Sequence, residues 1–479
     1  MSVSTVSLVL IASYLVVVKF IGFYAHKKSS QTTEDYFVVN RSVGTWMLMG
    51  TVIATMVNTL AVSGVPALVY KGGLLYLQMF VIGIIAPFMI YHFGPKIWKY
   101  GSEHKLMTQA EIFGHYYKSK TVLILIAVLG ILAAFPFMAI QISAVGKIFS
   151  AATSGVISYD LAVLICAASV GFYLYFGGSR AVVWTDMIQG VCFFAIIVIS
   201  AVLFWNWAGG YEVALASIAE ASPKHMTFHE KNTPIFIDNI LSWPFAFFLW
   251  PQLFQRMYMA KSAESLKKSA GISWFFFNAI VLCTFTMGIM GTSVFFGQLS
   301  DPDNLVAEMF AKYLPMGGAL IVLAVFATGM STIDSILLTS SSIITRDLLK
   351  TFRKSTSSSA QEFNLARITS VILLVLVTVF SLSDTGRGAI VPLVTLGASI
   401  ATLFLWPLLG MFTLKSVDSR PVLIALILGF TAIFFSKFFG IQGPFGTGSG
   451  TLGFLFGALG FSLGKVNLYG IESSVKLSR

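Results

Sequence analysis

The chain has 479 residues, of which 56% are hydrophobic and 11% are charged, and its mean hydropathy is +0.84. Soluble domains carry about 25% charged residues, so this composition excludes an ordinary soluble protein and predicts many membrane-spanning helices. The net charge of +11 does not indicate nucleic-acid binding, because the basic residues gather in alternate loops, as the positive-inside rule predicts.

Apolar stretches long enough to cross a bilayer recur along the whole chain. A helix needs about 20 apolar residues to cross about 30 Å of hydrocarbon. We expect an all-α integral membrane protein with about thirteen helices, in which residues 1–479 form a single transmembrane domain. The predicted helices cover residues 6–25, 43–70, 74–94, 121–149, 159–177, 181–207, 234–254, 270–297, 316–342, 363–383, 388–413, 421–439 and 450–464.

The first stretch has no basic segment before it, and Lys27 and Lys28 follow it. This arrangement predicts a retained helix with its N-terminus outside rather than a cleaved signal peptide. The loops on the cytoplasmic side then carry most of the basic residues, Arg256 and Lys261 among them. We therefore expect a multi-pass protein of the plasma (inner) membrane with a cytoplasmic C-terminus.

Two predicted helices contain residues that interrupt a helix. The stretch 43–70 contains Asn58 and Pro66, and the stretch 234–254 contains Pro244 and Pro251. Each is the first helix of a possible five-helix unit, residues 43–207 and 234–413. An odd number of helices inverts the second unit relative to the first. Interrupted helices at matching positions of inverted repeats point to the central site of a transporter, although a plain proline kink is the simpler alternative.

Four hydroxyl residues of the ninth predicted helix share one face because they are three and four positions apart: Thr328, Ser331, Thr332 and Ser335. Hydroxyl oxygens are ligands that a small hard cation such as sodium prefers. Small hydroxyl residues also allow close packing of membrane helices, so the pattern alone leaves both interpretations open.

Two carboxylates fall within predicted spans, Asp334 and Asp186. A carboxylate in a span costs about 2.5–3.5 kcal/mol on insertion scales and usually marks an ion path or a binding site. Asp186 has a second interpretation, because at a helix start its charge would favour the positive end of the helix dipole.

Aromatic residues lie close to the prolines of the seventh predicted helix, and the fourth adds Phe137 and Gln141. Aromatic rings with one amide suit a small, partly apolar solute, whereas packing against lipid explains most rings in such a chain. The sequence contains no phosphate-binding loop, zinc-protease helix or nucleophile elbow, so we expect neither an enzyme nor a cofactor.

Five stretches together resemble the sodium:solute symporter family, which includes bacterial proline, pantothenate and monocarboxylate importers. They are residues 35–44, 64–73, 177–186, 251–260 and 330–335, and they follow one another along most of the chain. The resemblance implies the inverted-repeat fold of a bacterial leucine importer. It also implies a sodium site formed by the backbone oxygens of Ala54 and Val57 and the oxygens of Thr328, Ser331 and Thr332.

The resemblance further implies a second sodium site or an ion path at Asp186, Ser331, Asp334 and Ser335. It places the substrate among Met56, Asn58, Phe137, Gln141, Trp243, Phe247 and Pro251. The proline importers have a tyrosine where this chain has Phe137 and Phe247, and an acidic residue where it has Met56, so the substrate pocket matches less well.

We therefore expect a sodium-coupled symporter that imports a small organic solute by alternating access. The expected solute is a monocarboxylate, pantothenate or an amino acid, and the expected partners are sodium and the lipid bilayer, without nucleic acid. Two alternatives stay open at this stage. One is a proton-coupled carrier of the same fold that uses Asp334 or Asp186, and the other is a membrane sensor or channel without coupled transport.

Overall fold

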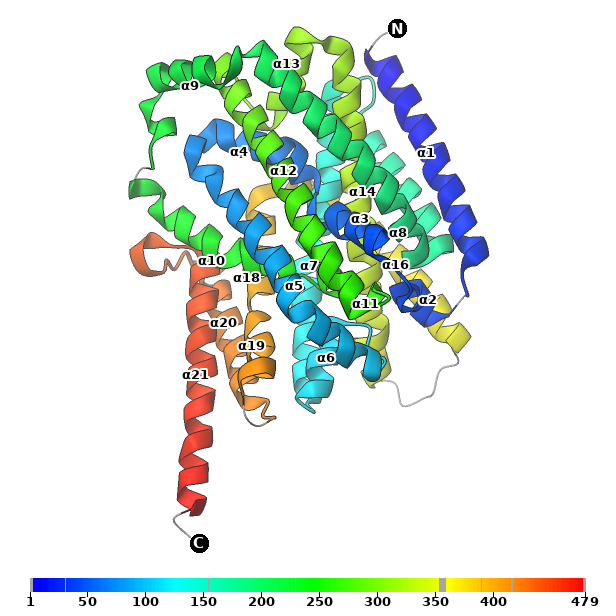
Figure 1. Cartoon of the computed structure of the whole chain (residues 1–479), viewed down its shortest axis with the longest axis vertical. Coiled ribbons are helices and arrows are strands. Elements are labelled where there is room, and N and C mark those ends of the chain that lie inside the picture. The colour runs from blue at the N-terminus through cyan, green and yellow to red at the C-terminus, as the bar shows by residue number, and fades with distance from the viewer. Residues whose placement is uncertain are drawn as a thin grey trace.

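The computed structural model describes residues 3–30, 32–153, 155–228, 230–352, 359–388, 390–414 and 417–476, and these are almost all helical, with no strand among them (Figure 1). The first half of the chain forms α1 (Val3–Lys28), α2 (Thr33–Val38), α3 (Thr45–Met56), α4 (Val65–Gly72), α5 (Met79–Glu103), α6 (Gln109–Tyr116), α7 (Lys120–Ala152), α8 (Tyr159–Trp207) and α9 (Gly210–Ala221). The second half forms α10 (Thr233–Leu249), α11 (Pro251–Met259), α12 (Ala263–Phe295), α13 (Leu305–Tyr313), α14 (Gly318–Ser342), α15 (Lys350–Phe352), α16 (Ser359–Leu382), α17 (Asp384–Gly388), α18 (Ile390–Thr402), α19 (Leu405–Thr413), α20 (Arg420–Phe439) and α21 (Ser449–Lys476).

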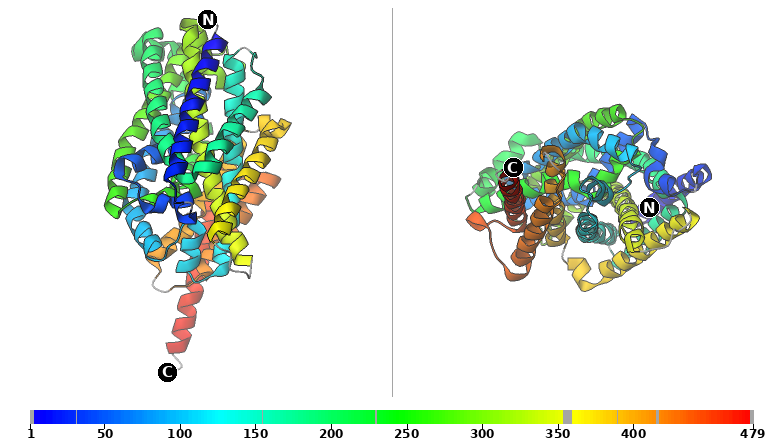
Figure 2. Two further views of the ribbon diagram at one scale, coloured as in Figure 1. Left: turned by 90° about the vertical axis from the view of Figure 1, so that its right-hand side faces the viewer. Right: turned by 90° about the horizontal axis from the view of Figure 1, so that it is seen from below.

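The long helices run along one common direction, and α1 begins at the end of the molecule opposite to the end of α21 (Figures 1 and 2). Nine helical stretches of the described chain are long and apolar enough to cross a membrane. The all-α membrane fold is thus confirmed. The number thirteen stays a prediction, since several helices are interrupted or joined end to end. Residue 389, inside the predicted stretch 388–413, lies outside the described residues.

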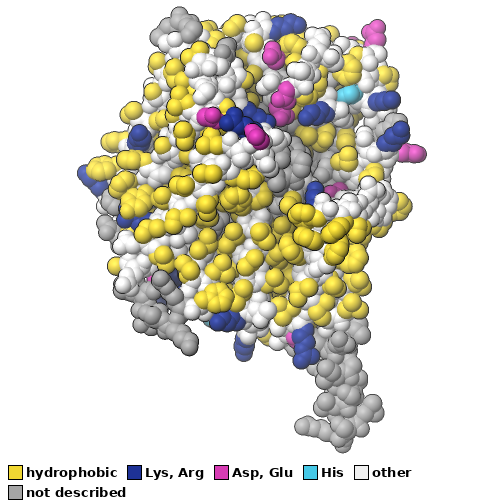
Figure 3. Space-filling view, turned by 180° about the vertical axis from the view of Figure 1, so that it is seen from behind, with side chains coloured by type: hydrophobic (Ala, Val, Ile, Leu, Met, Phe, Trp, Pro, Cys, Tyr) yellow, Lys and Arg dark blue, Asp and Glu magenta, His cyan; other side chains and the backbone are white. Residues whose placement is uncertain are grey.

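The outer surface is apolar where a soluble protein would be polar. Ile372 and Val379 on α16 are 54% and 63% exposed. On the face drawn in Figure 3, hydrophobic side chains form a broad band, and charged side chains gather mostly toward the two ends. A band of this kind is stable against lipid and unstable against water. The protein is therefore embedded in a membrane.

Gly178 reverses the direction of the chain within α8. Its backbone leaves the helical region (φ 53°, ψ −150°), a conformation that glycine adopts without strain. Near the start of α8 the Thr153 carbonyl contacts Ser4 at the beginning of α1, whereas Gln189, eleven positions after Gly178, contacts Tyr14 midway along α1. Because Gly178 itself lies against Tyr36, beyond the end of α1, the two halves of α8 run in opposite directions. This reversal separates the predicted stretches 159–177 and 181–207.

The predicted interruption of residues 43–70 lies at the end of α3. Val57 has an extended backbone (φ −90°, ψ 106°), and a π-helical turn, Leu60–Gly64, leads into α4. The Thr59 amide donates to Gln141 Oε1 at 3.0 Å, and the Leu60 amide donates to Asn58 Oδ1 at 2.9 Å. Side chains thus replace the backbone acceptors that the break removes, as a membrane interior requires.

The second predicted interruption lies between α10 and α11. Trp250 has an extended backbone (φ −59°, ψ 134°), which is the conformation that the following proline favours. Pro251 begins α11, where its missing amide hydrogen costs no helical hydrogen bond. Pro244 lies inside α10 and does not end it. The break therefore falls at the second of the two prolines.

Candidate ion and substrate sites

The end of α3 lies directly against α14. Ser331 Oγ is 3.1 Å from the Ala54 carbonyl oxygen, to which it donates, and both residues are fully buried. Next to this contact, Gly329 lets α14 pack closely on α7 and on the chain after α3, because a Cβ atom there would lie 2.7 Å from Val145 Cγ2 and 3.2 Å from Thr59 Cγ2. The structure thus brings the hydroxyl face of α14 to the last turn of α3, the arrangement that the family resemblance implies.

Two hydroxyls of this face use their hydrogens within α14, and Ser331 shares its one hydrogen between the Ala54 carbonyl and the Thr328 carbonyl at 3.0 Å. Thr328 Oγ1 donates to the Ala324 carbonyl at 2.9 Å, and Thr332 Oγ1 donates to the Thr328 carbonyl at 3.0 Å. A hydroxyl has one hydrogen and two lone pairs, so each of these oxygens keeps lone pairs for another partner. Thr328, Ser331 and Thr332 are fully buried, as is Val57 at the break. These residues could together hold a small cation.

A second buried polar cluster lies one to two turns further along α14. Asp186, on the second half of α8, accepts from Thr51 Oγ1 on α3, and Asp334 Oδ2 accepts from the hydroxyl of Tyr173 on the first half of α8. Ser335 Oγ donates to the Ser331 carbonyl at 2.8 Å and lies 3.2 Å from Asp334 Oδ1. All of these residues are buried, so the predicted ion-path residues do meet in one place.

The position of Arg256 differs from the one predicted by the distribution of basic residues among the loops. Its position after the seventh predicted helix assigns it to a cytoplasmic loop, but the structure buries it to 2% exposure on α11. Its Nη2 lies 3.3 Å from Asp186 Oδ2 and also donates to Ser335 Oγ. The loop assignment is wrong because the break at Trp250 starts a new helix, α11, that directs Arg256 inward. Sequence reasoning also missed Thr51 and Tyr173, which carry no charge to draw attention.

The predicted substrate residues divide into two groups. Met56, Asn58, Trp243 and Phe247 line a narrow, mainly apolar cavity of about 70 Å³ between α3, α10 and α12. Phe137, Gln141 and Pro251 are not among the residues that line it. The Phe137 ring stacks on Trp250, with 4.5 Å between ring centroids and an interplanar angle of 4°. Trp250 in turn packs against Phe247, which lines the cavity.

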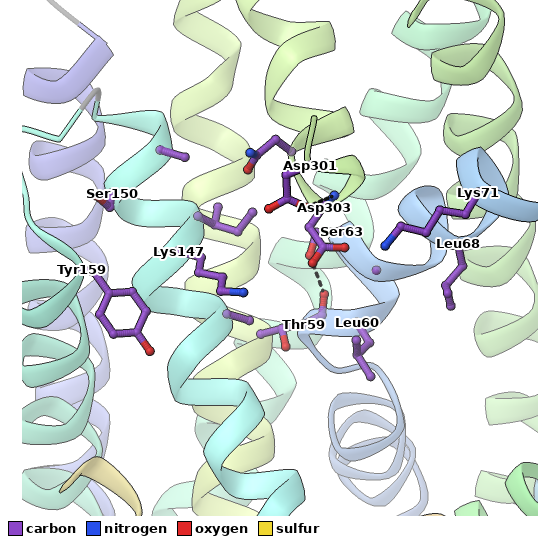
Figure 4. A pocket seen from close by; sticks show the side chains of 15 residues that line it. Thr59, Leu60, Ser63, Leu68, Lys71, Lys147, Ser150, Tyr159, Asp301 and Asp303 are labelled. Atoms are coloured by element: carbon purple, nitrogen blue, oxygen red, sulfur yellow. Dashed lines mark hydrogen bonds between the residues drawn. The ribbon is translucent and has the colours of Figure 1, made fainter. Parts of the chain in front are cut away.

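A larger cavity of about 410 Å³ lies beside the first, and both share Leu60 and Leu68 in their linings. Lys71 and Lys147 extend into the larger cavity from opposite walls, and Asp301 and Asp303 project from the segment above them (Figure 4). The cavity is also lined by the last turn of α7, next to Thr153 and the start of α1. It therefore lies toward the end of the molecule where α1 begins.

The profile of one protein family, described as "Sodium:solute symporter family", matches residues 36–429. The chain belongs to the sodium:solute symporter family. This symporter is 24% identical to an uncharacterized symporter, YhjB, of Bacillus subtilis over 440 residues, which cover 89% of this chain and 88% of that protein. It is 26% identical to sodium/proline symporter 2 of Staphylococcus saprophyticus over 390 residues, which cover 78% of this chain and 74% of that one.

Solved structures agree with this assignment at the level of the fold. The symporter superimposes on a Na⁺-coupled sialic acid symporter, solved in a substrate-bound outward-open state, with a TM-score of 0.80, 17% identity and 96% coverage of both chains. It superimposes on Mhp1, a nucleobase-cation-symport-1 family transporter, with a TM-score of 0.55, 13% identity and coverage of 92% and 95%. The fold is that of the leucine importer, and the symporter is a multi-pass transporter rather than an enzyme.

Proposed function

We propose that this symporter uses a sodium ion bound between α3 and α14 to import a small organic carboxylate by alternating access. The observation that carries the proposal is the 3.1 Å approach of Ser331 Oγ to the Ala54 carbonyl at an interrupted helix. A sodium ion there would be held by the carbonyls of Ala54 and Val57 and by the oxygens of Thr328, Ser331 and Thr332. In that position the ion would join the two helices.

The choice of a carboxylate is supported by two buried donors, each in contact with a residue that lines a cavity. Gln141 bonds to Thr59 of the larger cavity. Trp250 packs against Phe247 of the smaller one, with 5.2 Å between ring centroids. Gln141 Nε2 and Trp250 Nε1 have no acceptor among the described residues. A buried donor without an acceptor costs about 1–3 kcal/mol, so a ligand oxygen that fills this role gains that free energy. The apolar lining of the small cavity favours a solute that has a compact apolar part beside its carboxylate. A monocarboxylate, pantothenate and an apolar amino acid all fit this description.

The arrangement of the two cavities supports alternating access. The larger cavity would admit solute from the side on which α1 begins, which we propose is the outside, and Leu60 and Leu68 would separate it from the smaller cavity. The interrupted helices would begin inverted repeats, residues 43–207 and 234–413, that move against each other around the site. A sodium ion that crosses a potential of 100 mV contributes about 2.3 kcal/mol, enough for roughly 50-fold accumulation of a zwitterionic amino acid. A monocarboxylate anion that moves with one sodium ion carries no net charge across the membrane, so its accumulation would depend on the sodium gradient alone.

Uptake by purified protein in liposomes tests the proposal. A panel of labelled monocarboxylates, pantothenate and amino acids is offered with an inward sodium gradient, and again with potassium in place of sodium. We expect at least one member of the panel to accumulate only in sodium. Uptake that ignores sodium and follows pH would instead favour the proton-coupled carrier, and flux that never saturates would favour a channel.

A further inference from the structure

The side chain of Arg256 enters the cluster where a second sodium ion would need its oxygens. Its Nη2 donates to Ser335 Oγ and lies 3.3 Å from Asp186 Oδ2, and its Nε donates to Thr55 Oγ1 at 3.2 Å. Asp186 and Ser335 are two of the residues that a second sodium would use. One nitrogen of a guanidinium group thus already lies between them.

The carboxylate oxygens of the cluster make few other hydrogen bonds. Asp334 Oδ2 accepts from the Tyr173 hydroxyl, and Asp334 Oδ1 lies 3.2 Å from Ser335 Oγ, whose one hydrogen is shared with the Ser331 carbonyl at 2.8 Å. Only Asp186 Oδ1 has no partner among the described residues. Each carboxylate oxygen keeps lone pairs, so oxygen ligands are present. A second cation bound to them would lie beside the guanidinium, and repulsion between the two positive charges opposes its binding.

The guanidinium is a permanent charge. An arginine side chain keeps its proton under all physiological conditions, so it cannot leave the cluster by deprotonation. It is attached to α11, contacts α3 through Thr55 and contacts α14 through Ser335. The first sodium would join α3 and α14 in the same way, with Ala54 adjacent to Thr55 in the chain.

We propose that the guanidinium of Arg256 is a built-in cation that takes the place of a second sodium ion, so that the symporter binds and couples a single sodium. The inference rests on the proposed function, because it presumes a sodium ion between Ala54 and Thr332. Loss of the guanidinium would open the cluster, with Asp186, Asp334 and Ser335 then free to bind an ion. The charge of residue 256 therefore sets the number of ions that drive transport.

The test counts sodium ions bound to the purified full-length protein in detergent, by equilibrium dialysis with radioactive sodium and without any solute. We expect one ion per chain for the wild-type protein and two for Arg256→Gln. The matched control Arg256→Lys keeps a cation in the cluster and stays at one. Arg256→Gln combined with Asp186→Asn removes one charge of each sign and returns the count to one.

Two results would overturn the inference. One is a wild-type protein that binds two sodium ions and drops to one with Asp186→Asn, a comparison that needs no change at Arg256. The other is a folded Arg256→Gln variant that still binds one. A wild-type protein that binds no sodium would overturn the proposed function itself. Failure of the proposed function is thus distinguished from failure of this inference, in which the wild-type protein binds two ions.

Discussion

Gln141 Oε1 accepts two hydrogen bonds from Thr59, one from the amide at 3.0 Å and one from the hydroxyl at 2.7 Å. A single side-chain oxygen from α7 thus satisfies the backbone at the point where the chain leaves α3. Because lipid offers no water to replace it, this acceptor is a condition for the interruption beside the proposed sodium site.

Gln141→Leu is therefore expected to destabilise the protein by about 1–3 kcal/mol, the cost of leaving a buried donor without a partner. The measurement is thermal unfolding in detergent, without sodium or solute. Gln78→Leu is the matched control, since Gln78 is also buried and neither of its polar atoms has a partner among the described residues. The control is expected to be neutral or stabilising. Equal losses of stability in Gln141→Leu and Gln78→Leu would contradict the role of Gln141 as the hydrogen-bond acceptor for the interruption after α3.

Thr332→Ala tests the sodium site. Loss of one oxygen ligand is expected to raise the sodium concentration for half-maximal uptake about 10- to 100-fold, because an interaction with a charged group contributes about 1.5–3 kcal/mol. Solute uptake is measured against sodium concentration in liposomes. Ser341→Ala is the control, since Ser341 is buried on the same helix but donates only to the Leu338 carbonyl. A sodium dependence that Thr332→Ala leaves unchanged would exclude this site.

Hydropathy and helical period were sufficient to predict the membrane fold, the two interrupted helices and the inward face of α14. These features are local, since each depends on residues within one helix. The hydroxyl spacing from Thr328 to Thr332 puts three oxygens on one side of a helix whatever the helix contacts. The contact between Ser331 and Ala54 was available only through the family resemblance, because it joins positions 277 residues apart.

Arg256 and Gln141 show what the sequence could not give. The positive-inside rule assigns basic residues by their place between spans and takes no account of the direction of a side chain. Arg256 is followed by Lys261 and Lys267, which do lie at the surface, so nothing in its immediate surroundings sets it apart. Gln141 was interpreted as a substrate ligand, but its oxygen is committed to Thr59, 82 positions away, and only its amide nitrogen is left for solute.

Gly178→Ala is expected to prevent folding of most of the protein. The backbone there has a φ of +53°, and a Cβ atom would lie 2.4 Å from Cδ2 of Tyr36. Both effects oppose the reversal between the two halves of α8. Gly190→Ala, in the second half of the same helix, places its Cβ 3.9 Å from the nearest atom and is expected to fold normally. The folding of both variants is measured as the amount of monodisperse protein after size-exclusion chromatography. A normal yield of Gly178→Ala would contradict the chain reversal at this position.

Trp250→Phe separates the packing of this residue from its capacity to donate. The smaller ring keeps the stack on Phe137 and removes Nε1, which has no acceptor among the described residues. The variant is expected to be somewhat less stable than the wild-type protein without solute, because the smaller ring leaves a void at a fully buried position, but no hydrogen bond is lost. Its KM for the transported carboxylate is expected to rise about tenfold or more, because a hydrogen bond to a charged group contributes about 1.5–3 kcal/mol.

Trp406→Phe is the control for this measurement, since Trp406 Nε1 is also buried without a partner in the described chain but packs against Phe454 and Phe461 of α21. Removal of Trp406 Nε1 is expected to leave the KM for the carboxylate unchanged. If Trp250→Phe and Trp406→Phe gave the same KM as the wild-type protein, the Trp250 indole would serve only to pack against α7. The carboxylate would then need another donor, and the amide nitrogen of Gln141 would be the first to test.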